Sequence, residues 1–413
     1  IEDNKDNQFF CYLSFNAPHT PLQVPDKYYQ MYKDIDPTNI NGESLEMTEK
    51  NIVDAKKIYG MVTNIDENFG KLRAKLAELE LEDNTILIFM SDNGQCHCAV
   101  NGVANAYNAG MRGYKGSEYD GGHRIPFIMR WPKGDMTGCR KVDELTSYVD
   151  FMPTLLDICG VEVSEAKRDF DGESLMPLLR GEKSPEYWDS RVVVTDTQRV
   201  AYPLKWQRSC VMKNKWRLVN RDHLYDIEAD SDQQHDIAAD YPELVEELRA
   251  EYEKWWKICT LQADEETPLS IGADDEMTRL NCMDLRNEHG MTVWNQREVR
   301  QGKACQGFWP IYAERDGVYE FELRRWPEEA GYAVSGAIKP EDDIEFNTEG
   351  ILPKDHVYYS GSEALNIELA QLHIHGMPVQ CEPVSTDQNA VKFKIELDKG
   401  EYQLRANFYN KDF

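Results

Sequence analysis

Short apolar runs and one long periodic segment dominate the first 160 residues of the chain. Residues 86–90 form an uninterrupted apolar run, and 9–15 and 127–131 are similar. Such runs are typical of parallel strands covered by helices on both faces. From Asn51 to Glu80 the apolar residues recur at three- and four-residue steps, which predicts an amphipathic helix lying on this sheet. A short helix is predicted over Tyr148–Gly160, with Asp150 placed to cap it.

The pattern then changes towards antiparallel pairing. Runs at 191–195 and within 209–220, followed by a helical pattern at 242–258, predict a small antiparallel sheet with a covering helix. Later runs at hairpin-like intervals predict a β-sandwich. We therefore expect an α/β fold with a mixed, mostly parallel sheet between helices and a C-terminal antiparallel β-sandwich domain. The expected parts are an α/β domain over 1–185, a subdomain over 186–259, a linker over 260–290 and the β-sandwich over 291–413.

Length and charge narrow the possible partners. A chain of 413 residues is too long for one compact core, so two or more domains are expected. Acidic residues outnumber basic ones by 74 to 46, which gives a formal net charge of −28. This excess argues against nucleic acid or an anionic membrane as the main partner, because both require basic patches. No window approaches 18 apolar residues, so no membrane span is expected. The ten cysteines are scattered, and Cys96-His97-Cys98 lacks zinc-knuckle spacing.

Polar side chains follow the predicted strands of the α/β domain. Asp92 and Asn93 come directly after the 86–90 run, and His19 stands between two prolines after the 9–15 run. Arg112 and Lys115 lie on a glycine-punctuated loop some twenty residues after Asp92. Carboxylate and amide oxygens suit Ca²⁺ or Mg²⁺, and the two cations suit an oxyanion. Each feature alone is also explained by a tight turn or a solvated loop.

Taken together and in this order, these motifs resemble the sulfatase family, the formylglycine-dependent arylsulfatases of the alkaline phosphatase superfamily. The resemblance covers roughly residues 8–258, and a segment from Trp294 to Pro327 is similar to the β domain of some bacterial sulfatases. The matching segments are Asn16–Pro21, Ser91–Gly94, Arg112–Ser117, Gly121–Phe127, Arg130–Pro132, Asp150–Leu156, Asp171–Leu175 and Leu224–Ile227. The resemblance implies an alkaline-phosphatase-like sheet.

The resemblance also implies roles for individual residues. Asp92 and Asn93 are expected to bind Ca²⁺, with Mg²⁺ as the alternative ion. Lys115 and His19 are expected to contact the sulfate group and to act in catalysis by protonating the leaving oxygen. For Arg112, and likewise Arg124, substrate contact and loop support remain equal alternatives.

The family's nucleophile, a formylglycine made from a Cys/Ser-x-Pro-x-Arg motif, is not encoded in this sequence. The most similar segment, Cys381–Ser385, lacks the arginine and lies in the predicted β domain. We therefore expect the N-terminal part of the catalytic domain to be missing here, and an N-terminal fragment or a partner chain to complete the site.

The expected function is hydrolysis of sulfate monoesters, with a small aryl sulfate or a sulfated glycan as substrate. The alternatives are a phosphate or phosphonate ester hydrolase of the same superfamily, and a non-catalytic relative that binds a glycan. The resemblance further implies export to the periplasm or the cell exterior.

Overall fold

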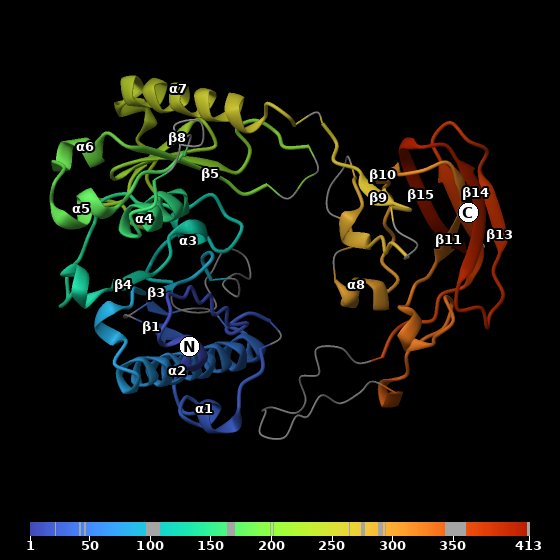
Figure 1. The fold of residues 1–413 in the computed structure, drawn as a ribbon, viewed down its shortest axis with the longest axis horizontal. Helices are drawn as coiled ribbons and strands as arrows, with labels where there is room; N and C mark the ends of the chain where they lie inside the picture. Colours follow the sequence, from blue (N-terminus) through green and yellow to red (C-terminus); the bar gives the residue numbers. More distant parts are fainter. Residues whose placement is uncertain are drawn as a thin grey trace. The chain divides into compact units, whose positions relative to one another are not determined.

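The chain divides into two compact units. The structure, a computed structural model, describes residues 1–20, 22–40, 43–44, 47–95, 108–162, 170–198, 200, 202–263, 265–273, 277–287, 292–293, 295–342 and 361–410. The first unit comprises Ile1–Gln198 with Leu204–Ile258, and the second comprises most of the described residues after Ile258 (Figure 1). No helix in the described ranges is long and apolar enough to cross a membrane. The domain boundaries expected above stay a prediction.

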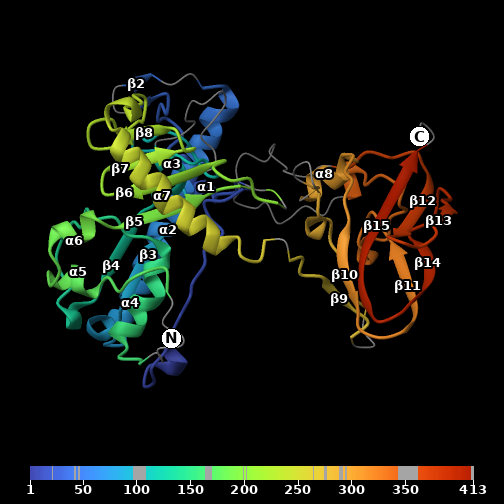
Figure 2. The ribbon, with the colours of Figure 1, turned by 90° about the horizontal axis from the view of Figure 1, so that it is seen from above.

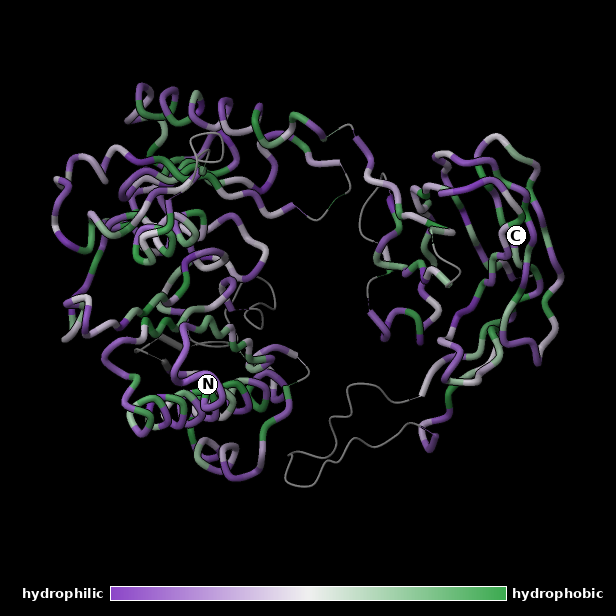
Figure 3. Tube along the Cα trace, viewed as in Figure 1, coloured by the Kyte–Doolittle hydropathy of each residue, from purple (hydrophilic) through white to green (hydrophobic). Residues whose placement is uncertain are grey.

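A long helix and a strand pair form the first layer of unit 1. Helix α2 (Glu49–Glu78) begins at Thr48, whose hydroxyl accepts a hydrogen bond from the Asn51 amide at 3.2 Å. Hydrophobic and hydrophilic positions alternate around α2 (Figure 3), as the periodicity predicts. Helix α1 (Asp26–Gln30) packs on α2, and two short strands, β1 (Asn39–Ile40) and β2 (Glu43–Ser44), pair nearby in the sequence.

The predicted strands after α2 are present. Strand β3 (Leu87–Met90) pairs with β4 (Phe127–Arg130), and the pair is antiparallel, although the apolar run predicts a parallel partner. Between them lies the short helix α3 (Asp120–His123). The α/β class and its C-terminal antiparallel sheets are confirmed, with sheets of mixed kind across the chain.

The strand expected at residues 9–15 is not formed. This segment forms no regular element and has no strand partner in the described residues, and most of its side chains are exposed, Phe10 by 79% and Tyr12 by 82%. Apolar composition alone does not make a strand, because a strand requires a neighbour for its backbone donors and acceptors.

A four-stranded antiparallel sheet forms the second layer of unit 1. Its strands are β5 (Val192–Asp196), β6 (Ser209–Lys213), β7 (Trp216–Val219) and β8 (His223–Asp226), in that order. Helix α7 (Pro242–Cys259) covers one face (Figure 2), burying Val245, Leu248 and Tyr252. The other face packs Val193, Cys210 and Met212 against Tyr119 and Leu145. The sheet therefore joins α7 to the segment that carries the candidate loop.

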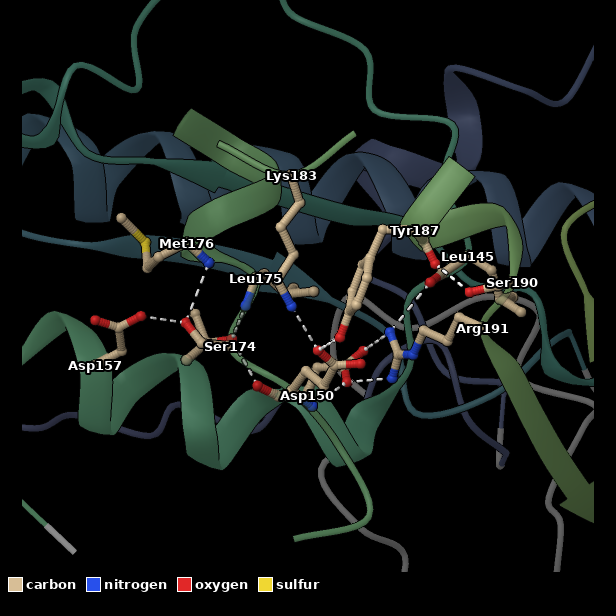
Figure 4. Close-up of polar contacts among 12 residues, drawn as sticks. Leu145, Asp150, Asp157, Ser174, Leu175, Met176, Lys183, Tyr187, Ser190 and Arg191 are labelled. Carbon is tan, nitrogen blue, oxygen red and sulfur yellow. Dashed lines mark hydrogen bonds and ion pairs between the residues drawn. The ribbon is translucent and has the colours of Figure 1, made fainter. Parts of the chain in front are cut away.

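A buried ion pair connects Asp150, directly before helix α4 (Phe151–Ile158), to Arg191, directly before strand β5. The guanidinium of Arg191 makes two contacts with the carboxylate of Asp150, whose side chain is fully buried (Figure 4). That carboxylate also accepts hydrogen bonds from the amides of Ser147 at 2.7 Å and Glu173 at 3.0 Å. As predicted, Asp150 takes part in capping this helical segment, because its bond from the Ser147 amide is half of a capping box with Ser147. Its side chain makes no further cap bond at the start of α4. The same carboxylate also orders the chain around α5 (Met176–Arg180) and α6 (Pro185–Asp189).

Unit 2 is built mainly of antiparallel strands. One sheet has five strands in the order β13-β12-β15-β10-β9, and a second sheet pairs β11 with β14. Side chains from both sheets share one core, including Ile311, Leu372 and Phe393. The elements are β9 (Leu269–Ile271), α8 (Gln296–Arg300), β10 (Trp309–Ala313), β11 (Gly317–Leu323), β12 (Ile367–Ile374), β13 (Gln380–Pro383), β14 (Val391–Leu397) and β15 (Gly400–Asn410). Strand β9 lies within the segment expected to be a linker and pairs in parallel with β10.

Candidate active site

The turn after β3 holds Asp92 and Asn93 by their backbone. The Tyr148 hydroxyl donates to the carbonyl oxygens of Ser91 at 3.0 Å and Asp92 at 2.5 Å. The Ser91 hydroxyl donates to the Asn93 carbonyl at 3.0 Å. Burial, and then the nearby Asp92 charge, raises the pKa of Tyr148, so its hydroxyl stays protonated as a donor at neutral pH. The Asp92 side chain itself is exposed.

The Lys115 loop is hydrogen-bonded directly to this turn. The Lys115 amide donates to the Gln95 carbonyl at 3.0 Å, and the Gly94 amide donates to the Gly122 carbonyl at 2.9 Å. The backbones are so close that a Cβ on Gly94 would lie 1.9 Å from the Gly121 carbonyl oxygen. The structure therefore brings the Asp92–Asn93 turn and Lys115 together. Among the residues that the structure describes, the Lys115 ammonium has no hydrogen-bond or ion-pair partner.

Arg112 supports the loop in this structure. Its Nη1 donates to the Gln233 carbonyl at 2.7 Å, and its guanidinium carbon lies 3.8 Å from the centroid of the Tyr119 ring. These contacts engage the side chain with protein groups, which favours the loop-support alternative. Substrate contact by Arg112 stays a prediction.

Asp120 holds the same loop through buried contacts, and the sequence analysis did not identify this role. Its buried carboxylate accepts from Arg217 Nε at 2.9 Å, and its amide donates to Gln233 Oε1 at 2.9 Å. Arg124 Nη1 lies 3.7 Å from the second carboxylate oxygen, so Arg124 also contacts this anchor. Burial lowers the pKa of the adjacent His123, which favours its neutral form. Asp120 follows no motif that could have indicated this role, because Arg217 lies 97 residues away.

His19 lies on a separate turn. Its amide donates to the Asn16 carbonyl at 2.9 Å, and its Nδ1 lies 2.8 Å from the Thr20 carbonyl oxygen. The side chain is exposed. In the described part of the chain, no hydrogen bond or ion pair links His19 to Asp92 or Lys115, so its place in the site stays a prediction.

The donor set at the turn matches part of a calcium site. Asp92 and Asn93 offer the hard oxygen ligands that Ca²⁺ and Mg²⁺ take, but Ca²⁺ requires six to eight of them. Within the described ranges no group of three or more His, Cys, Asp or Glu side chains could hold a metal ion. The role of the two residues as metal ligands stays a prediction. The segment Cys96-His97-Cys98 lies outside the described residues.

Comparison with known protein families covers the first unit. A sulfatase family model matches residues 1–161, and a model for the C-terminal part of N-sulphoglucosamine sulphohydrolase matches residues 114–257. The two matches overlap on the Lys115 loop and together span the whole of the first 257 residues.

Individual relatives agree with the family models. The uncharacterized sulfatase YdeN of Escherichia coli K12 is 26% identical over 278 residues, covering 59% of this chain and 46% of the relative. An arylsulfatase of Clostridium perfringens is 32% identical over 197 residues, covering 43% of this chain and 38% of the relative. The chain thus spans less than half the length of these relatives.

A solved structure matches the fold of the same region. The crystal structure of Ps i-CgsB in complex with k-i-k-neocarrahexaose is 30% identical, with a TM-score of 0.50, and the match covers 61% of this chain and 51% of that one. Family models over residues 1–257, curated relatives and the shared motifs all agree, and the chain belongs to the sulfatase family.

Proposed function

We propose that the complete protein carrying this chain hydrolyses sulfate monoesters. The observation that supports this most directly is the pair of backbone hydrogen bonds that holds the Lys115 loop against the Asp92–Asn93 turn. An arylsulfatase among the relatives and a carrageenan oligosaccharide bound to the similar solved structure make aryl and carbohydrate sulfates the first substrates to test.

Lys115 is proposed to bind the sulfate group. Its ammonium is partly exposed and has no protein partner among the described residues, so it can donate to sulfate oxygens without breaking an ion pair. Charge develops on these oxygens and on the leaving alcohol oxygen as the ester bond breaks, and a cation fixed on a rigid loop stabilises that charge. His19 is proposed to donate a proton to the leaving oxygen.

Asp92 and Asn93 are proposed to hold the metal ion, with Ca²⁺ expected and Mg²⁺ as the alternative. A bound divalent cation supplies Lewis-acid stabilisation of the sulfate oxygens. The Tyr148 and Ser91 hydroxyls hold the backbone carbonyls of both residues, so the backbone of the turn is fixed before an ion binds. The nucleophile, by family resemblance a formylglycine, is assigned to a segment or partner chain outside these 413 residues, which contain no Cys/Ser-x-Pro-x-Arg motif.

The test uses the complete protein and release of sulfate from 4-nitrophenyl sulfate and from a carrageenan oligosaccharide. Lys115→Ala and Asp92→Ala should each lower kcat by about 100-fold or more, since each removes a group that stabilises developing charge. Lys141→Ala is the matched control, because Lys141 is 83% exposed and its ion pair in the described part of the chain is with Asp143 on the surface. Asp92→Ala should also weaken Ca²⁺ binding in calorimetry, whereas the control should leave it unchanged.

Three results would contradict the proposal. Near-normal kcat in both variants, with unchanged melting temperatures, would remove Lys115 and Asp92 from the site. Faster hydrolysis of a phosphonate monoester than of any sulfate ester would favour the phosphonate hydrolase alternative. Glycan binding without hydrolysis would favour the non-catalytic alternative.

A further inference from the structure

The hairpin between β5 and β6 has two faces, and one of them lies towards the loop that carries Lys115. In the antiparallel register, Val194 pairs with Val211 on the α7 face, and Val193 pairs with Met212 on the opposite face. The last strand pair, Asp196 with Ser209, falls on the α7 face by the same alternation. The next pair is Thr197 with Arg208, joined by the Thr197 amide and the Arg208 carbonyl at 3.1 Å. Both side chains of that pair therefore belong to the face that packs against the Lys115 loop.

The Gly116 carbonyl is the point of contact between hairpin and loop. It accepts a hydrogen bond from the Thr197 hydroxyl at 3.0 Å and a longer one from Arg208 Nη1 at 3.4 Å. Gly116 directly follows Lys115 and has a φ of +81°, a conformation that favours glycine. The Arg208 guanidinium is thus in contact with the backbone of the residue that directly follows Lys115.

Arg208 is available to an anionic ligand. Its side chain is exposed, and in the described part of the chain it forms no ion pair with an acidic residue. A guanidinium has five N–H donors, and the Gly116 carbonyl takes only one of them. Lys115 and Arg208 are thus two cations without an acidic partner among the described residues, on two segments that are joined at the Gly116 carbonyl.

Hydrogen bonds of the Gln198 side chain fix the conformation of the hairpin loop. The Gln198 side chain closes its own loop, because Nε2 donates to the Leu204 carbonyl at 2.8 Å and Oε1 accepts from the Leu204 amide at 2.7 Å. Gln198 Nε2 also contacts both Asp196 carboxylate oxygens at 3.0 Å. These bonds occupy Asp196, the nearest acidic side chain on the hairpin, and keep it on the α7 face.

We infer that Arg208 determines substrate specificity by binding a second anionic group, a sulfate or a carboxylate, on the alcohol part of the ester. Lys115 takes the sulfate that is removed, and Arg208 takes the neighbouring anion with two parallel N–H···O bonds. The preferred substrate class is then a glycan sulfate with at least two anionic groups rather than a simple aryl sulfate. The inference rests on the proposed function, because it names the substrate class of the same site.

The experiment compares variants of the complete protein on three substrates. These are 4-nitrophenyl sulfate, a disaccharide with two sulfates, and the same disaccharide with a carboxylate in place of the second sulfate. Arg208→Ala should raise KM about 10- to 100-fold for the two-anion disaccharide that the wild type prefers, with kcat little changed, because a charge-assisted bidentate contact is lost. KM for 4-nitrophenyl sulfate should stay within about twofold. Arg208→Lys should recover part of the loss, and Arg180→Ala, at another exposed arginine, should behave as the wild type.

The outcomes separate the inference from the proposed function. A selective rise in KM for the disulfated or the carboxylated substrate supports the inference and identifies the second anion. Equal losses on all three substrates, or a loss in kcat alone, would overturn it in favour of a structural role. Unchanged kinetics on the disaccharides would also overturn it. Release of sulfate from none of the three substrates by the wild type would refute the proposed function, and the inference with it.

Discussion

Replacing Gly94 by alanine should separate the two segments that form the candidate site. An added Cβ would lie 1.9 Å from the Gly121 carbonyl oxygen and 3.1 Å from that of Gly122. An ordinary carbon–oxygen contact requires a shift of roughly 1.5 Å, and backbone on both sides must provide it. The turn that carries Asp92 and the loop that carries Lys115 would then move apart.

The magnitude follows from this shift. A displacement of about 1 Å in a catalytic group can cost about 100-fold in rate, so kcat/KM for sulfate ester hydrolysis should fall by about 100-fold or more. Overpacking of this kind costs about 1–3 kcal/mol of stability, which lowers Tm by about 2–12 °C for a unit of this size. The loss of activity should therefore greatly exceed the loss of folded protein at assay temperature.

Gly70→Ala is the matched control. Gly70 lies in α2, and a Cβ there would meet nothing within 4 Å. Alanine should stabilise the helix by up to about 1 kcal/mol and leave kcat/KM unchanged. The complete protein is assayed by sulfate release and by thermal melting. If Gly94→Ala kept kcat/KM within about twofold of wild type at an unchanged Tm, close packing would not be what holds the two segments together.

Two further predictions concern the rest of unit 1. Arg191→Met should lower the free energy of unfolding by about 3–5 kcal/mol in chemical denaturation, because it leaves the buried Asp150 carboxylate without its cation. Adding Asp150→Asn should recover part of this stability. A loss below about 1 kcal/mol in Arg191→Met would contradict the argument. The Tyr28 hydroxyl, with two lysines, lowers the pKa of Glu67 to about 2, so the contact stabilises the fold above pH 4.5 and is lost as the pH falls towards 2. The difference in Tm between wild type and Glu67→Gln should therefore shrink across that pH range, whereas a constant difference would exclude this linkage.

The spacing of apolar residues along the chain correctly predicts several helices and strands. Helices α2 and α7 follow from apolar residues at helical spacing, and β14 alternates buried and exposed residues along its whole length. The run at 9–15 has the same apolar character as a strand, but strand formation depends on a partner that the described residues do not supply. Composition cannot reveal whether that partner is present.

Long-range contacts at the candidate site are not encoded in any short motif. Backbone hydrogen bonds bring Lys115 and the Asp92–Asn93 turn together, and the roles that the family resemblance implies for these residues stay a prediction. The contacts of Asp120 with Arg217 and of Arg112 with Gln233 cross 97 and 121 residues, and nothing in the local spacing indicates them. Asp150 is a related case, because its position indicates the cap that it forms with Ser147 but not its ion pair with a buried arginine 41 residues away.

The attachment of the β5–β6 hairpin at the Gly116 carbonyl has a consequence for how this protein family can diversify. The register of the two strands is fixed up to Asp196 and Ser209, and Thr197 secures the base of the loop to Gly116. Trp206 is fixed as well, because its ring stacks on Tyr252 of α7 and its amide donates to the Tyr252 hydroxyl at 2.9 Å. The exposed residues between these two anchors are the part of the hairpin that can change in length at small free-energy cost. Because Arg208 pairs with Thr197 at this fixed base, the proposed preference for a second anion would change with that one side chain, while the residues proposed to bind the sulfate group stay in place.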